Sequence, residues 1–495
     1  MNLGETRIAE PASAQRGGQP DPGVPPLRRG PTPGVAAILS LILPGLGQIL
    51  NGAVRRGILI ALPTLALVGI VAVALSGGSK ALLADLVQPS VLLVVLAANG
   101  VFGVYHVVAI GDAFWVSWRR GPKAASTGRS VAFLVIALVA ALGLHGLVGG
   151  IGLQAYSTVS TVFVPPTSDY AIPVPSFGPE TPPPSGFPDE PTPTPGPAWS
   201  ADGRLNLLLI GADSGPGRYL LRTDTMIVLS VDIATGRSAL FGIPRNLLNA
   251  PLPPESAAAF KDGRFPGLLN ALYVYAFQHP SQFPGEDGPA RGFRAISGAV
   301  QQLIGVPLDG AVVVNLNGFV DLVNAIGGLW IRTVHVYDDR YPLENGSGDV
   351  TINITAGCHH LNGHLALAYA RSRHQDSDYG RMQRQQAVLV ALLHQVDPIA
   401  LLPKVPRLLD IAKDNLTVAI PAADMGGLAQ LASTVDPDGV ERVEFAPPQY
   451  PEFLTTKEIA RIQVAVRTVF DTPVASPAPS AAAQPVATPK SCGPG

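Results

Sequence analysis

Two carboxylates stand where apolar segments of the chain end or begin. Asp213 follows the run Leu205–Ile210, and Asp224 comes directly before the run Thr225–Val231. Short runs rich in aliphatic and β-branched residues are typical of core strands, so both side chains are expected at neighbouring strand ends. Mg²⁺ takes one or two protein carboxylates and fills its other positions with water and phosphate oxygens. The pair therefore favours a divalent-cation site, although an Asp in a Gly-rich turn is also an ordinary turn former.

Arginines accompany these carboxylates. Arg222 lies two residues before Asp224, and Arg245 follows the next apolar run. Four more crowd into fourteen residues that contain no lysine: Arg371, Arg373, Arg381 and Arg384. A guanidinium binds phosphate oxygens through two parallel hydrogen bonds, whereas a lysine offers only a point charge. The set predicts a phosphate-binding site, and a solvated helix face paired with Asp376 and Asp378 is the alternative.

Composition excludes several kinds of site and partner. Segment 211–217 is Gly-rich but lacks the GxGxxG and GxxxxGK[ST] spacings of phosphate-cradling loops. The net charge of −2 and the 14% of charged residues give no reason to expect nucleic acid as a partner. Two cysteines cannot make a disulfide framework. Cys358-His359-His360 is interpreted as a surface turn, and a bond from Cys358 to Cys492 in the C-terminal tail is not expected.

Strand and helix patterns intermix between about Asp202 and Asp471. The predicted strands are Leu205–Ile210, Thr225–Val231, Ala239–Ile243 and Val312–Leu316, with a hairpin turn at Ala234–Gly236. The predicted helices are Gly292–Ile304, Gly318–Ile326 and Arg381–Val396. The expected fold class is therefore α/β, with a mixed sheet flanked by helices on both faces.

Three upstream segments are apolar enough to cross a bilayer, which takes about 20 residues. They are Gly57–Gly78, Ser90–Gly111 and Ser130–Tyr156. The shorter run Gly34–Leu50 is interrupted by Pro44 and two glycines, which favours a re-entrant or interfacial segment. Basic residues of short loops stay in the cytoplasm, and only a re-entrant 34–50 segment places all of them there. The chain is thus predicted to be a multi-pass membrane protein with everything after about Tyr156 outside the cytoplasm.

Stretches rich in Pro, Gly, Ser and Thr divide the chain into five parts. We predict a disordered cytoplasmic tail over 1–33, a membrane region over 34–156, a spacer over 157–201, a folded domain over 202–471 and a disordered tail over 472–495.

A series of short motifs covers most of residues 203–400. It runs Asn206-Leu-Leu-Leu-Ile-Gly211-Ala-Asp213, Arg222-Thr-Asp224-Thr-Met226, Gly242-Ile-Pro-Arg245, Asn270-Ala-Leu-Tyr273, Asn324-Ala-Ile-Gly-Gly328, Leu361-Asn-Gly363, Ala368-Tyr-Ala-Arg371-Ser-Arg373 and Asp378-Tyr-Gly-Arg381-Met-Gln-Arg384-Gln385-Gln386. In order and spacing the series resembles the LytR-CpsA-Psr (LCP) family of bacterial cell envelopes.

The resemblance implies a membrane-anchored phosphotransferase with its catalytic domain outside the cytoplasm. Such enzymes move a glycopolymer phosphate from undecaprenyl pyrophosphate to peptidoglycan. By motif, Asp213 and Asp224 would hold Mg²⁺. The predicted catalytic residues are Arg222, Arg245, Arg371, Arg373, Asp378 and Arg381. The predicted substrate-binding residues are the five arginines of that set together with Arg384 and Gln385.

Phosphoryl transfer depends mainly on positioning and charge neutralisation, which suits a metal ion and an arginine cluster. The polyprenyl chain of the donor needs an apolar groove. Segments 319–326 and 387–393 could line one, and plain core is the alternative for both.

Two positions depart from the family pattern. Asn246 stands where an Asp usually follows Ile-Pro-Arg, and Leu268 replaces the usual Lys two residues before Asn270. Because the carboxylates and arginines are present, an active transferase is preferred. The alternatives are a hydrolase of pyrophosphate lipids and a non-catalytic regulator of the kind labelled transcriptional attenuators, although no helix-turn-helix signal is present.

Overall fold

The computed structural model describes residues 30–76, 86, 88–120, 127–163, 203–215, 218–285, 287–333, 335, 337–343, 348–373, 377–396, 400–471 and 492. Residues 1–29 of the tail predicted over 1–33, most of the 157–201 spacer, and the 472–495 tail apart from Cys492 lie outside these residues. Two compact units form, one from Met1–Val68 with Phe102–Leu144 and one from Gly69–Val101 with His145–Gly495.

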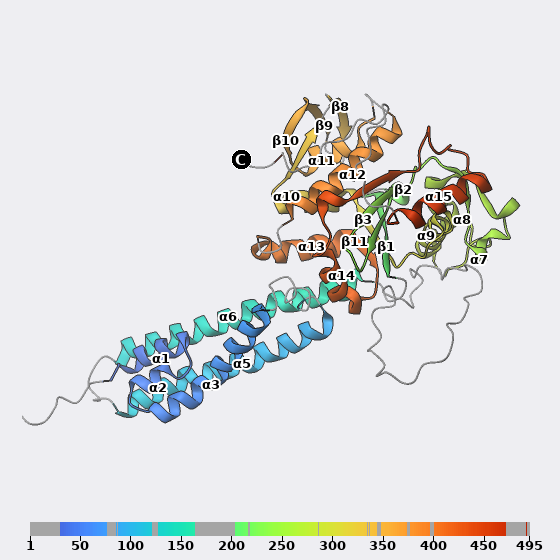
Figure 1. The fold of residues 1–495 in the computed structure, drawn as a ribbon. Coiled ribbons are helices and arrows are strands. Elements are labelled where there is room, and N and C mark those ends of the chain that lie inside the picture. The colour runs from blue at the N-terminus through green and yellow to red at the C-terminus, as the bar shows by residue number, and fades with distance from the viewer. Residues whose placement is uncertain are drawn as a thin grey trace, which may run out of the picture. The chain divides into compact units, whose positions relative to one another are not determined.

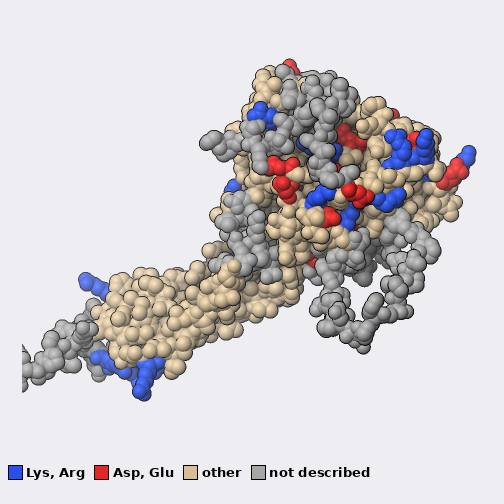
Figure 2. All heavy atoms as spheres, viewed as in Figure 1, with Lys and Arg blue, Asp and Glu red and all other residues tan. Residues whose placement is uncertain are grey.

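The upstream helices are α1 (Pro33–Ile42), α2 (Leu46–Leu50), α3 (Val54–Ser76), α5 (Pro89–Arg120) and α6 (Thr127–Val162). By length and composition, three stretches are apolar enough to cross a membrane: Val54–Ala74, Pro89–Arg120 and Gly128–Val162. Figure 2 shows almost no charged side chains along these helices between their ends.

A break separates α1 from α2 instead of one helix over 34–50. Gly45 adopts φ 99° there, and a Cβ on it would lie 2.1 Å from the Gly57 carbonyl oxygen. The polar side chain of Gln48 is fully buried and donates to the Ala109 carbonyl oxygen at 3.0 Å and to Asp112 at 3.1 Å. Buried polar groups need such partners, so Gln48 holds α2 against α5.

The folded domain is built on a six-stranded mixed sheet in the order β11-β6-β1-β2-β3-β12. Its strands are β1 (Arg204–Gly215), β2 (Arg218–Asp232), β3 (Ser238–Gly242), β6 (Gly310–Asn315), β11 (Leu416–Ala419) and β12 (Glu441–Glu444). β1 pairs antiparallel with β2 and parallel with β6, while β12 runs parallel to β3. This mixed sheet with its flanking helices confirms the predicted fold class (Figure 1).

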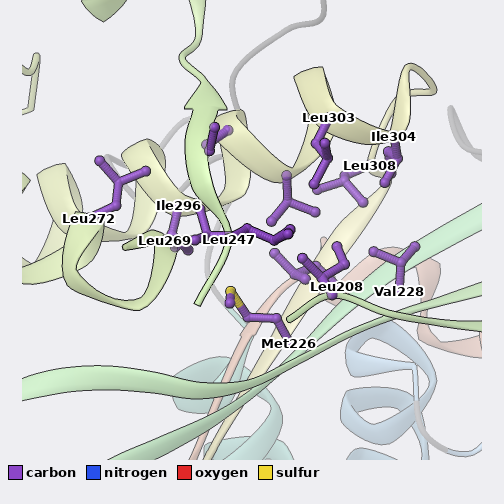
Figure 3. Close-up of a cluster of buried hydrophobic side chains, with 14 of the residues drawn as sticks. Leu208, Met226, Val228, Leu247, Leu269, Leu272, Ile296, Leu303, Ile304 and Leu308 are labelled. Atoms are coloured by element: carbon purple, nitrogen blue, oxygen red, sulfur yellow. The ribbon is translucent and has the colours of Figure 1, made fainter. Parts of the chain in front are cut away.

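Each face of the sheet is covered by helices because strand residues alternate between faces. The helices are α7 (Pro254–Ala257), α8 (Leu272–Gln278), α9 (Gly288–Ile304), α10 (Leu316–Ile326), α11 (Gly363–Arg371), α12 (Asp378–Gln395), α13 (Val405–Asn415), α14 (Met425–Ala432) and α15 (Thr456–Thr468). Leu208 and Val228 belong to one hydrophobic core with α9 residues such as Leu303 and Ile304, as Figure 3 shows. On the opposite face, Ile227 and Leu240 contact Val390 of α12.

A second core joins α10, α11 and α12 to two small sheets. These pair β7 (Leu329–Thr333) with β10 (Gly357–Leu361) and β8 (Tyr337–Pro342) with β9 (Asp349–Ile354), while β4 (Leu248–Pro251) pairs with β5 (Arg264–Leu268) elsewhere. The segments 319–326 and 387–393 contribute Val323, Val388 and Ala391 to this core. These three positions are buried in a hydrophobic core, so the structure supports the plain-core alternative and not a groove at these positions.

Two of the quoted motifs meet at the start of α11. The Gly363 backbone N–H donates to the Asn324 side-chain oxygen at 2.9 Å, and a Cβ on Gly363 would lie 2.2 Å from the Val320 carbonyl oxygen. Only glycine allows α11 to approach α10 this closely. These motif residues therefore hold the start of α11, the helix that ends at Arg371, against α10.

The cysteines correct two expectations. Cys358 and Cys492, which are 134 positions apart in the sequence, form a disulfide. Cys358-His359-His360 is not a surface turn but part of strand β10, where His359 pairs with Ile331 of β7. The expectation failed because composition marks the tail as unstructured but carries no information on where a single cysteine within it lies.

The disulfide predicts a loss of stability in Cys492→Ser. Removing a cross-link frees the unfolded chain, and we expect unfolding to be easier by about 2–4 kcal/mol. Thermal unfolding of the full chain in detergent measures the change. Reductant should lower the unfolding midpoint of the wild type to that of the variant. Peptide mapping of the unreduced protein should recover the linked pair, and two separate thiol peptides would contradict the bond.

Candidate active site

The site forms where β2, the loop after β3 and the first turn of α12 meet. In the pairing of β1 with β2, Gly211 faces Thr225 and Ala212 faces Thr223, so Asp224 is the extra residue of a β-bulge. Bulges locally re-aim side chains and occur beside active sites. Asp378 begins α12, and its carboxylate lies at the helix N-terminus, where the helix dipole favours negative charge.

Arginines converge on these two carboxylates. Arg245 Nη1 donates to Asp224 Oδ1 at 2.6 Å, and Arg245 Nε donates to Asp378 Oδ2 at 3.0 Å. Arg381 Nη2 lies 3.2 Å from Asp378 Oδ2 and 3.2 Å from the Asp224 carbonyl oxygen. Arg373 Nη1 lies 3.4 Å from Asp378 Oδ1. The structure thus joins five residues from four segments, namely β2, the loop after β3, the loop after α11 and α12, into one ion-pair network.

The electrostatics of the network favour an additional anion. Burial raises the pKa of Asp224, but the hydrogen bond and charge of Arg245 outweigh it and hold the pKa below the ordinary 3.8. Burial lowers the pKa of Arg381 to about 10, with Asp378 opposing and Arg245 adding to the effect. The side chain of Arg381 is 5% exposed, and its buried Nε has no hydrogen-bond partner among the described residues. Three arginines surround two carboxylates, and the excess of positive charge suits a phosphate group.

Two predicted arginines lie outside the contacts of this network. Arg222 of β2 is exposed and pairs in register with Asp213 of β1, whose side chain is not among those described. Arg371 ends α11, and its guanidinium lies 5.7 Å from the centre of the Tyr341 ring. No described contact joins either arginine to Asp378.

Arg384 is buried away from its predicted role as a substrate-binding residue, and Gln385 contacts the same part of the chain. Arg384 is 1% exposed, and its guanidinium donates to the Tyr369 carbonyl oxygen at 3.0 Å and to the Ser372 carbonyl oxygen. Gln385 Nε2 lies 3.4 Å from the Ala370 carbonyl oxygen. Both side chains therefore hold the end of α11, and the buried guanidinium of Arg384 has no exposed surface to offer a substrate.

Sequence reasoning missed three side chains beside the network. Asn270 Nδ2 lies 3.4 Å from Asp224 Oδ1. Tyr379 donates its hydroxyl to Glu452, which also accepts from Asn246 at 2.7 Å. Asn270 lies within a quoted motif and could have been nominated, whereas Glu452 is in a Pro-rich segment without any signal.

The carboxylates determine how well a divalent cation would fit. The described residues contain no group of three or more His, Cys, Asp and Glu side chains that could hold a metal ion. Asp224 is the described carboxylate at the bulge, and the hydrogen bonds from Arg245 and Asn270 go to its Oδ1. Asp213 pairs two residues away from it in the strand register. A site of one or two carboxylates plus substrate oxygens matches Mg²⁺ chemistry.

Comparison with known proteins assigns the chain to a family. The LytR_cpsA_psr family matches residues 188–456, which is more than half of the chain. The chain belongs to this family. The matched region contains β1 to β12 and every residue of the ion-pair network.

Individual relatives are distant. Biofilm regulatory protein A of Streptococcus mutans is 26% identical over 222 residues, 44% of this chain and 50% of that protein. The Bacillus subtilis polyisoprenyl-teichoic acid–peptidoglycan teichoic acid transferase TagV is 31% identical over 214 residues, 43% of this chain and 48% of that protein. The chain thus matches about half the length of these LCP relatives. The crystal structure of B. subtilis TagV aligns with a TM-score of 0.40 at 22% identity, covering 55% of this chain and 98% of that one.

The ion pair of Asp224 predicts a pH-dependent contribution to stability. Because the folded-state pKa lies below the unfolded value, the contribution is full above pH 3.8 and is lost as the pH falls through the lower folded pKa. At pH 7 we expect Asp224→Asn to cost about 1.5–3 kcal/mol, as for hydrogen bonds to charged groups. Thermal unfolding across the pH range should show this difference shrinking below pH 3.8, and a constant difference would contradict the ion pair. Asp321→Asn on α10 is the matched control.

Proposed function

We propose that this LCP protein is a membrane-bound phosphotransferase that moves a glycopolymer phosphate from undecaprenyl pyrophosphate to peptidoglycan. The observation that carries the proposal is the network around Asp378, in which three arginines surround two carboxylates. The names of relatives such as TagV support the same chemistry, since that protein is named for transferring teichoic acid from a polyisoprenyl carrier to peptidoglycan.

The arginines would bind and orient the pyrophosphate of the donor. Arg245 and Arg381 come from different segments and are fixed by Asp224 and Asp378, so their guanidinium planes are set before the substrate arrives. Arg373, whose side chain is 47% exposed, would extend the set towards solvent. Preorganised donors of this kind stabilise the charge that develops on phosphate oxygens during transfer. An acceptor hydroxyl of the glycan would attack one phosphorus, and polyprenyl phosphate would leave.

We propose Mg²⁺ as the cofactor, held by Asp224 and Asp213. Bound there, the ion would neutralise charge on the phosphate oxygens. The strand register supports the pair, since Asp213 lies opposite Arg222 and Asp224 follows two residues later. Asp224 would keep its hydrogen bond from Arg245 and use its other oxygen for the ion.

We propose a multi-pass protein with the folded domain outside the cytoplasm. Arg56 forms an ion pair with Asp112, and Arg120 Nη1 donates to the Asn51 carbonyl oxygen at 3.0 Å. The start of α3 and the end of α5 therefore meet at one basic end of the helical unit, as expected for a cytoplasmic face. The disulfide of Cys358 with Cys492 supports export of the rest, because such bonds persist in oxidising compartments.

Anion binding can be tested without any turnover. We expect inorganic pyrophosphate to raise the unfolding midpoint of the full chain in detergent, because a ligand at a hundred times its Kd stabilises by about 2.7 kcal/mol. Arg381→Gln and Arg373→Gln should reduce the shift. Arg407→Gln, an exposed arginine on α13, is the matched control and should leave it unchanged. An equal shift in all four proteins would place the anion elsewhere.

The reaction is tested with the full chain, a synthetic polyprenyl-pyrophosphate-linked disaccharide and a peptidoglycan fragment. We expect a phosphodiester-linked adduct by mass, lost in Arg245→Gln and on chelation by EDTA, and restored by Mg²⁺. Free sugar phosphate in place of the adduct would instead establish the hydrolase. Binding with neither product would favour the non-catalytic regulator, and an adduct insensitive to EDTA would refute the Mg²⁺ proposal.

A further inference from the structure

An exposed carboxylate, Glu452, links the two halves of the ion-pair network from outside. Its Oε1 accepts a hydrogen bond from Asn246 Nδ2 at 2.7 Å and a second from the hydroxyl of Tyr379. Asn246 Nδ2 also lies 3.5 Å from that hydroxyl. One carboxylate therefore contacts the residue after Arg245 and the residue after Asp378.

The backbone around Glu452 is held in place by β4. The Leu248 N–H donates to the Glu452 carbonyl oxygen at 2.8 Å, and the Leu454 N–H donates to the Leu248 carbonyl oxygen at 3.0 Å. Asn249, which has a positive φ of 64°, donates its side-chain amide to the Leu454 carbonyl oxygen at 2.6 Å. The position of Glu452 is thus built into the fold and does not depend on a free loop.

The donors and the acceptor among Tyr379, Asn246 and Glu452 follow from their chemistry. Burial and the hydrogen bond with Glu452 raise the pKa of Tyr379 to about 12. The phenol therefore keeps its proton near neutral pH and remains a donor, as the amide of Asn246 is. Glu452 is the acceptor of both bonds.

We propose that Glu452 is a positioning residue for the transfer reaction, acting through Asn246 on Arg245 and through Tyr379 on Asp378. This inference rests on the proposed function. Asn246 and Tyr379, which Glu452 contacts, flank the Arg245–Asp378 ion pair. The geometry of this pair sets the direction in which the Arg245 guanidinium points.

A swap of amide and carboxylate separates this role from plain structural support. Glu452→Gln removes the charge, and we expect kcat to fall by about 10- to 100-fold, the order expected when reacting groups are displaced by up to about 1 Å. Asn246→Asp places a second carboxylate against the first and should also lower kcat. The double variant Asn246→Asp with Glu452→Gln restores one carboxylate and one amide in exchanged positions, and its kcat should rise well above that of either single variant.

The assay is the transfer reaction above with the full chain in detergent, measured for kcat and for the KM of the polyprenyl-pyrophosphate disaccharide. Glu255→Gln on α7, an exposed Glu whose carboxylate lies 3.8 Å from Arg294, is the matched control and should keep wild-type kcat. Unfolding midpoints identify any variant that fails to fold. If the wild type is active, either of two results overturns this inference alone. One is an unchanged kcat in Glu452→Gln, and the other is a double variant whose kcat is no higher than that of the less active single variant. Wild type without any product overturns the proposed function and with it this inference.

Discussion

The two-carboxylate, three-arginine network is the constraint on which the rest of the site depends. Arg245 lies between Asp224 of the sheet and Asp378 of α12, so one guanidinium joins two layers of the domain. Removing these charges from water is costly, and the cost is met only when each group has its partners. The network can therefore form only where the bulge of β2, the loop after β3 and the N-terminus of α12 meet.

Two hydrophobic cores hold those three segments. The core between the sheet and α9 fixes β2 and β3, and the second core fixes α11 against α12. Arg384 adds to the second core, since it is buried and binds the carbonyl oxygens of Tyr369 and Ser372. A single helix, α12, thus carries both an arginine for the site and an arginine for its support.

Charged side chains and apolar helices occupy different parts of the chain. Figure 2 shows that acidic and basic side chains gather on the folded domain, whereas the helices α3, α5 and α6 carry few between their ends. The described residues thus combine an arginine cluster with helices apolar enough to cross a membrane. The Cys358–Cys492 bond is consistent with a domain that works in an oxidising compartment.

Sequence alone determined the local elements and the residue types of the site. The strands around Leu208 and Val228 and the helix over Arg381–Val396 follow from hydrophobic periodicity, which neighbouring residues carry by themselves. The motif series also pointed to Arg245, Asp224 and Asp378. Only the tertiary structure decided which arginine faces the site, because burial of Arg384 depends on contacts between segments. It alone placed Glu452 and Cys492 beside their partners, since pairings across such long stretches of chain leave no periodic signal in the sequence.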